Sequence, residues 1–115
     1  MVKIGTIGAA YLGALIDADG WIINFFLPKA QPGSRWSRRA GVAMQLESAE
    51  GVECIAAILR LTRAGNIRIW NPGGHSGKLL ISWNLTGKQR VTELCQAIAP
   101  FSVKAQRFLA NYAPP

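Results

Sequence analysis

Two acidic residues, Asp17 and Asp19, are the side chains of this sequence best suited to chemistry. They are its only aspartates, and both lie in the segment Tyr11-Leu12-Gly13-Ala14-Leu15-Ile16-Asp17-Ala18-Asp19-Gly20. Apolar and small residues precede the acids and a glycine follows them, a pattern that predicts a helix ending at the acids. Because carboxylate oxygens are ligands for hard divalent cations, this helix end is a candidate metal site.

The charge of the chain indicates the kind of partner on which such a metal would act. Lysine and arginine number 13 and aspartate and glutamate 6, which gives a net charge of +7 and an isoelectric point near 10.1. A basic protein of this kind attracts polyanions, with DNA or RNA first and an anionic membrane surface second. A basic surface with one acidic focus therefore indicates metal-dependent chemistry on a nucleic acid.

Length and composition predict one domain over residues 1–115 with a single core, since 50% of the residues are hydrophobic. The N-terminus lacks the features of a signal peptide, and the apolar run from Ile4 to Ile16 is too short to span a bilayer. We expect an intracellular protein, cytoplasmic or organellar, without a membrane partner. Cys54 and Cys95 lack metal-ligand spacing and are expected to be reduced core residues.

The spacing of apolar residues alternates between helical and strand periods along the chain. It predicts helices over residues 6–16, 49–62, 87–98 and 102–111, and strands over 21–27, 38–47, 66–70 and 78–85. The resulting order, α-β-β-α-β-β-α-α, predicts an α+β fold with a four-stranded antiparallel, saddle-like sheet and helices on one face. The other face of the sheet is left open for a partner.

The segment from Leu12 to Gly20 resembles the signature of the LAGLIDADG homing endonucleases. Seven of nine positions match, with one alanine and one glycine exchanged. The predicted order of elements, the basic charge and the length also fit that family. A weaker similarity is the segment Pro100-Phe101-Ser102-Val103-Lys104, which is similar to the family's proline-aromatic segment before a basic residue near the active site.

The resemblance implies a site-specific, Mg²⁺-dependent DNA endonuclease, with Ca²⁺ or Mn²⁺ as substitute ions for binding or cleavage. By resemblance, Asp19 and the carbonyl of Ala18 hold the metal and Lys104 assists catalysis, while Asp17 has a structural role. Family members with one motif per chain act as homodimers on long, near-palindromic sites. Small side chains at helical spacing allow two backbones to approach closely, and the expected interface residues are Ala9, Ala10, Gly13 and Ala14.

The open face of the sheet is then the expected DNA-binding surface, because a β-ribbon fits the major groove and alternate residues reach the base edges. The candidates for base contacts are Lys29, Gln31, Arg39, Gln45, Arg68, Lys78, Ser82 and Asn84. The candidates for phosphate contacts are Arg35, Arg38, Lys88 and Arg107.

The sequence also departs from the family pattern. Glu47, Ser48 and Val52 stand where the family often has a glutamine or a basic residue, and Lys104 lies one residue too near Pro100. The second hypothesis is therefore a non-cleaving nucleic-acid-binding protein on the same fold, either an RNA-splicing maturase or a DNA-binding regulator. A third is a basic dimerising protein whose motif match is accidental.

Other site types fit the sequence less well. An EF-hand loop beginning at Asp17 needs glutamate at its twelfth position, which here is Pro28. His75 is the only histidine, so a zinc site has no support. Gly73 and Gly74 lack the lysine and helix of a phosphate-binding loop.

Overall fold

The strands form one antiparallel sheet with the spatial order β1-β2-β4-β3. The structure is a computed structural model that describes residues 4–27, 37–71 and 79–111, with the side chains of 24–27, 37–39 and 48–50 left out. The strands are β1 (Gly20–Leu27), β2 (Ser37–Glu47), β3 (Asn66–Trp70) and β4 (Leu80–Thr86). The two hairpins, β1–β2 and β3–β4, meet through the pairing of β2 with β4.

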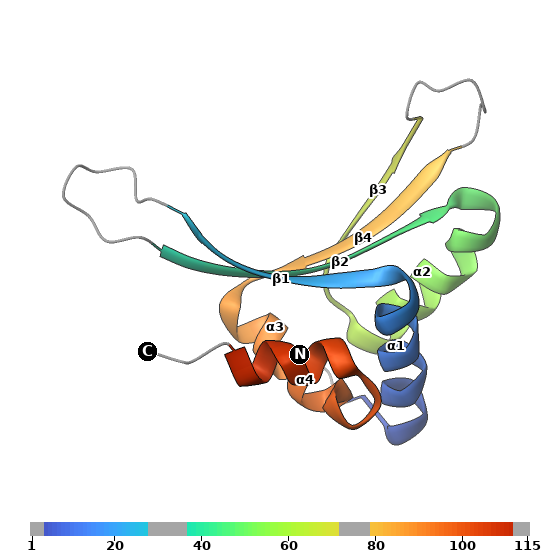
Figure 1. The fold of residues 1–115 in the computed structure, drawn as a ribbon. Coiled ribbons are helices and arrows are strands. Elements are labelled where there is room, and N and C mark those ends of the chain that lie inside the picture. The colour runs from blue at the N-terminus through green and yellow to red at the C-terminus, as the bar shows by residue number, and fades with distance from the viewer. Residues whose placement is uncertain (1–3, 28–36, 72–78, 112–115) are drawn as a thin grey trace.

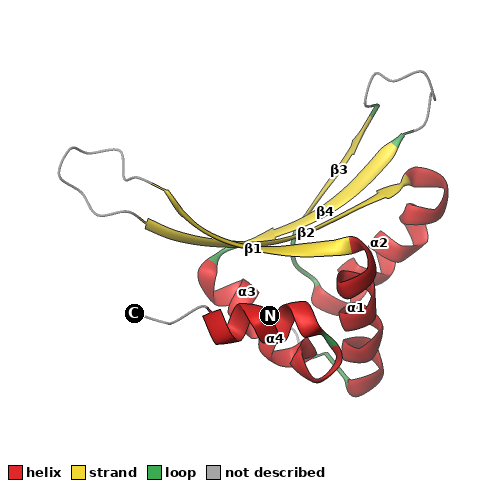
Figure 2. Cartoon of the chain, in the orientation of Figure 1, coloured by secondary structure: helices red, strands yellow, loops and turns green. Residues whose placement is uncertain are grey.

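The helices are α1 (Thr6–Asp19), α2 (Ser48–Thr62), α3 (Lys88–Ile98) and α4 (Val103–Asn111), with a 3₁₀ turn, η1 (Ala99–Phe101), before α4. They cover one face of the sheet and leave the other open (Figures 1 and 2). The predicted α+β fold and order of elements are thus confirmed, apart from the turn η1. In the described part of the chain, no helix combines the length and hydrophobicity that crossing a bilayer needs.

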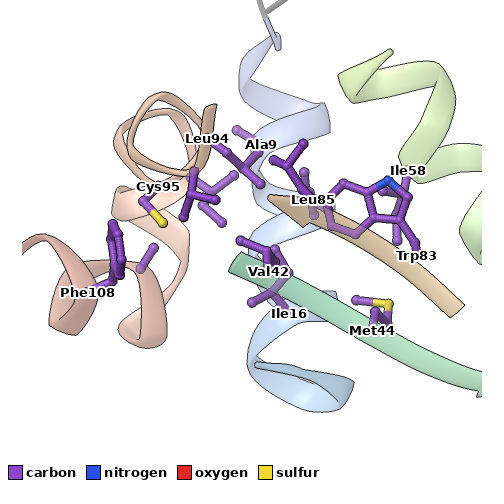
Figure 3. Packing of buried hydrophobic residues seen from close by; sticks show 14 of the residues in the cluster. Ala9, Ile16, Val42, Met44, Ile58, Trp83, Leu85, Leu94, Cys95 and Phe108 are labelled. Carbon is purple, nitrogen blue, oxygen red and sulfur yellow. The ribbon is translucent and has the colours of Figure 1, made fainter. Parts of the chain in front are cut away.

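The core fills the layer between the sheet and the helices. Side chains alternate across a strand, so one face of β2 and β4 supplies the core residues Val42, Met44, Ile81, Trp83 and Leu85. Helical side chains pack against them, including Ala9 and Ile16 of α1, Ile58 of α2, Leu94 and Cys95 of α3 and Phe108 of α4 (Figure 3). Cys54 and Cys95 are free cysteines, as predicted, although Cys54 is only partly buried.

The indole of Trp83 is fully buried, and its nitrogen needs a hydrogen-bond acceptor there. Trp83 Nε1 donates to the carbonyl of Ala64 at 2.9 Å. A short turn after α2 brings Ala64 to this position. In this turn the backbone of Arg63 has the left-handed helical conformation and Gly65 has a φ of +100°. A Cβ at Gly65 would overlap the indole nitrogen of Trp83, so this position requires glycine for both conformation and space.

The Gly65→Ala substitution should therefore lower the free energy of unfolding by more than about 1 kcal/mol, because it adds both backbone strain and overlap with Trp83. Gly41→Ala is the matched control, since its new Cβ would lie at an ordinary 3.5 Å from the carbonyl oxygen of Leu85. Urea denaturation of both variants measures the difference. Equal stability of the two variants would contradict this account of Gly65.

Candidate metal site and nucleic-acid interface

The carboxylate of Asp17 joins the end of α1 to the beginning of α4. Its Oδ1 accepts hydrogen bonds from Ser102 Oγ at 2.7 Å and from the backbone N–H of Lys104 at 3.2 Å. Its Oδ2 accepts one from the backbone N–H of Val103 at 2.8 Å. Asp17 therefore has the structural role that the sequence predicts, but it serves the start of α4 and not the end of its own helix.

Ser102 completes this connection, and the sequence analysis did not single it out. Its hydroxyl donates to Asp17 and accepts from the N–H of Ala105 at 3.0 Å, which is the bond of an N-capping serine. Together Asp17 and Ser102 satisfy the N–H groups of residues 103 to 105. A serine at the beginning of the last predicted helix was the signal that could have revealed it.

The negative charge of Asp17 lies at the positive end of the α4 dipole. Burial by itself raises the pKa of this carboxyl, but the hydrogen bonds from Ser102, Val103 and Lys104 outweigh burial and hold the pKa below its ordinary value. Asp17 is consequently ionised at neutral pH, and all of its described contacts serve the α1–α4 connection. It is thus poorly placed to ligate a metal.

Lys104 reaches from the first turn of α4 to the end of α1. Its Nζ donates to the carbonyl of Gly20 at 2.6 Å and to that of Ile16 at 3.3 Å. These carbonyls bracket Ala18 and Asp19, so the structure brings together the predicted basic and acidic residues despite the short spacing from Pro100. An ammonium group has three donors, and two are used here.

Asp19 differs from Asp17 in its surroundings. It is the last residue of α1 and is exposed, and its carboxylate forms no hydrogen bond or ion pair with another described residue. The carbonyl of Ala18 lies in the last turn of the helix, where backbone acceptors lack intrahelical donors. An available carboxylate, a carbonyl and the negative end of a helix dipole suit a hard divalent cation. Within the described residues, no group of three or more His, Cys, Asp or Glu side chains could hold a metal.

The open face of the sheet gathers four of the residues predicted to contact DNA. Gln45 of β2 pairs with Ser82 of β4, and Ser82 also pairs with Arg68 of β3. Asn84 lies two residues further along β4 on the same face. Asn66, which sequence reasoning missed, pairs with Asn84. The guanidinium of Arg68 lies 5.0 Å from the ring centroid of Trp70, which fixes its position by a cation–π contact.

The availability of these four side chains is not equal. Gln45 and Arg68 are exposed, whereas Ser82 is 6% exposed and accepts a 3.3 Å hydrogen bond from the amide of Asn84. Arg38 and Arg39 lie in β2 opposite Phe26 and Phe25, but their side chains are not described. Lys88 and Arg107 are exposed on α3 and α4. The other four candidates, Lys29, Gln31, Arg35 and Lys78, lie outside the described residues.

The prediction that Ala9 and Gly13 form a dimer interface is wrong. Ala9 is 3% exposed and belongs to the core. Gly13 is buried against η1, where an added Cβ would lie 3.0 Å from both the Cβ and the carbonyl oxygen of Phe101. The small residues at these positions allow other parts of the same chain to pack closely against α1. Ala14 is exposed and Ala10 partly exposed, so only these two of the predicted set remain accessible.

The part of the open face next to Asp19 carries apolar side chains. Trp21 is 43% exposed and Ile23 is 38% exposed, and they pair with Ala43 and Gly41 of β2. Apolar side chains on a DNA-binding face contact thymine methyl groups or sugars and do not form hydrogen bonds with bases.

Comparison of the sequence with models of known families and with curated proteins gives no match. The structure, however, is similar to solved structures of homing endonucleases. It matches I-CvuI in complex with DNA with a TM-score of 0.68 and 16% identity, over 90% of this chain and 63% of that one. It matches the group I intron-encoded I-CeuI complexed with DNA with a TM-score of 0.69 and 12% identity, over 96% of this chain and 56% of that one.

A further match is the LAGLIDADG homing endonuclease I-SmaMI bound to cleaved DNA, with a TM-score of 0.66 and 13% identity, over 94% of this chain and 35% of that one. The chain therefore spans less than two thirds of the length of each of these proteins. The helical layer under an open, curved sheet defines an α+β fold (Figure 1). In particular, this protein has the fold of the LAGLIDADG homing endonucleases, as the motif predicts.

Asp17→Asn should lower the free energy of unfolding by about 1.5–3 kcal/mol at neutral pH, because an amide replaces a charged acceptor. The lowered pKa means that this stabilisation is fully present above the ordinary carboxyl pKa and is lost as pH falls through the pKa of the folded state. The difference between wild type and variant should therefore shrink in acid. Urea denaturation across that pH range measures it.

Asp19→Asn is the matched control, since it makes the same chemical change two residues away at an exposed position. It should leave stability nearly unaltered at neutral pH. An equal loss in both variants would mean that the connection to α4 is not what distinguishes the two acids.

Proposed function

We propose that this protein is a site-specific double-strand DNA endonuclease of the homing type, active as a homodimer with divalent metal ions. The observation that carries the proposal is the contrast between the two motif acids: Asp17 is engaged by α4, whereas Asp19 is exposed and available at the same helix end. The fold and the bound DNA of I-CvuI, I-CeuI and I-SmaMI support the choice of substrate.

Asp19 and the Ala18 carbonyl would hold Mg²⁺, with further oxygen ligands from DNA phosphates and from the second copy of Asp19. A bound metal ion supplies activation of water and stabilisation of the leaving oxygen in phosphodiester hydrolysis. Lys104, with one donor unused by the Gly20 and Ile16 carbonyls, would place positive charge beside the reacting phosphate. Asp17 is a positioning residue, because it fixes the first turn of α4 from which Lys104 extends.

The exposed face of α1 supports the dimer. Its accessible residues recur at helical spacing and are apolar or small, with Ile7 88% exposed and Tyr11 41% exposed. Ala10, Ala14 and Ala18 share this side of the helix and leave room for a second backbone. Contact along this face would bring together the two ends of α1 and hence the two copies of Asp19.

The open face supports sequence reading by Gln45 and Arg68, which are exposed and lie on either side of Ser82 in one row across the sheet. Arginine suits guanine and glutamine suits adenine, each through paired hydrogen bonds in the major groove. Two copies of the sheet related by a twofold axis would read a long, near-palindromic site.

The test of cleavage begins with a duplex recovered by binding in Ca²⁺ from a random-sequence library. In Mg²⁺ the wild type should cut both strands of that duplex. Asp19→Asn should bind it but cut it roughly a thousandfold more slowly, because loss of the metal ligand removes several kcal/mol of charge stabilisation. Glu53→Gln makes the same change at an exposed acid on α2 and should cut as the wild type does.

Undiminished cutting by Asp19→Asn would refute the assignment of the metal site. Binding by the wild type without cutting in any divalent metal would favour the DNA-binding regulator on this fold. A preference for RNA would favour the maturase.

The test of the dimer uses Ala14→Arg, which puts a long charged side chain on the exposed face of α1. Sedimentation velocity should show a dimer for the wild type and a monomer for this variant. Ala110→Arg makes the same change at an exposed position of α4 and should remain dimeric. A monomeric wild type, or equal behaviour of the two variants, would contradict an interface on α1.

A further inference from the structure

A pocket of about 500 Å³ lies between the edge strand β1 and α4. From α4 it is lined by Lys104, Arg107, Phe108 and Asn111, and from β1 by Trp21 and Ile22. The α4 residues follow helical spacing and so share one face of the helix. The volume is in the range of pockets that hold small molecules or parts of larger ligands.

The pocket has an apolar floor and a polar rim. Phe108 is 6% exposed and Ile22 packs against the core, so they form an apolar floor, and the half-exposed Trp21 lines the pocket beside the open face. Arg107 and Asn111 are exposed at the rim, and the guanidinium of Arg107 forms no hydrogen bond or ion pair with another described residue. A guanidinium with its five donors available is suited to a phosphate group.

The position of the pocket relates it to the candidate metal site. Lys104 lines the pocket and also holds the end of α1 through the Gly20 carbonyl. Trp21 follows Gly20 directly and stands on the open face opposite Ala43. A DNA strand that passes from the open face to Asp19 would therefore run along this edge of the sheet.

We propose that this pocket binds one backbone phosphate of duplex DNA together with its sugar. Arg107 contacts the phosphate near the positive charge of Lys104, and the sugar packs against Trp21 and the apolar floor. This inference rests on the proposed function for its choice of DNA, and it adds a backbone contact that anchors the strand beside the metal site. The sequence predicts Arg107 as a phosphate contact, and the structure supplies the residues that would act with it.

The test is equilibrium binding of a fluorescently labelled, random-sequence duplex in Ca²⁺ over a range of salt concentrations. Each phosphate contact that is lost lowers the slope of log K against log salt by about 0.9. Arg107→Ala should weaken binding and lower the slope by about this amount for each subunit, or about 1.8 for the proposed homodimer. Arg90→Ala removes the same charge from an exposed position of α3 and should leave the slope nearly unchanged.

Trp21→Ala separates the two parts of the pocket, because an apolar contact releases no counterions. It should weaken binding without altering the salt slope, and thermal unfolding of all three variants shows that each is folded. An unaltered slope in Arg107→Ala, or an equal fall in Arg90→Ala, would overturn the phosphate site. Unaltered affinity in Trp21→Ala would overturn the sugar contact. If the wild type binds no duplex, the proposed function fails as well, whereas a wild-type protein that binds with unchanged slopes in the variants refutes only the pocket.

Discussion

The connection between Asp17 and the first turn of α4 is the interaction on which the candidate site depends. The chain places α4 more than eighty residues after the motif, as the separation of 85 between Asp17 and Ser102 shows. One carboxylate satisfies the start of that helix and thereby holds Lys104 at the end of α1. Because Asp17 is used in this way, Asp19 is the acid left accessible. Two identical side chains two residues apart thus have opposite roles, set by their hydrogen-bond partners.

The sheet connects this helix end to a recognition surface. Its inner face is filled by the core around Trp83 and Val42, which fixes the strands against the helices. Its outer face remains open and carries Gln45, Arg68 and Asn84 in adjacent rows. Since Gly20 begins β1 directly after Asp19, the acid and the open face belong to one rigid unit. If a loop separated Asp19 from β1, the acid and the sheet could shift relative to each other.

The fold was predictable because its periodic patterns are strong. The alternation of Ile81, Trp83 and Leu85 with Ser82 and Asn84 identifies the inner and outer faces of β4, and both assignments hold. Local sequence could not reveal which neighbours α1 meets. Ala9 and Gly13 are small residues that suit either an internal or an intermolecular contact. The packing of Ala9 in the core and of Gly13 against Phe101 of η1 became evident only from the structure. The partners of Asp17 could not be predicted from the sequence either. A carboxylate that caps a distant helix produces no local pattern, and the only local signal is the serine before α4. The apolar floor under Arg107 depends in the same way on the packing of α4 against β1.

The most direct test of the account is a crystal structure of the protein with a selected duplex and Ca²⁺. The account predicts an ion about 2.3–2.6 Å from a carboxylate oxygen of Asp19, with Asp17 still bonded to Ser102 and to the backbone of α4. An ion bound by Asp17, or a complex in which the DNA lies away from the open face and Asp19 contacts no metal, would contradict it.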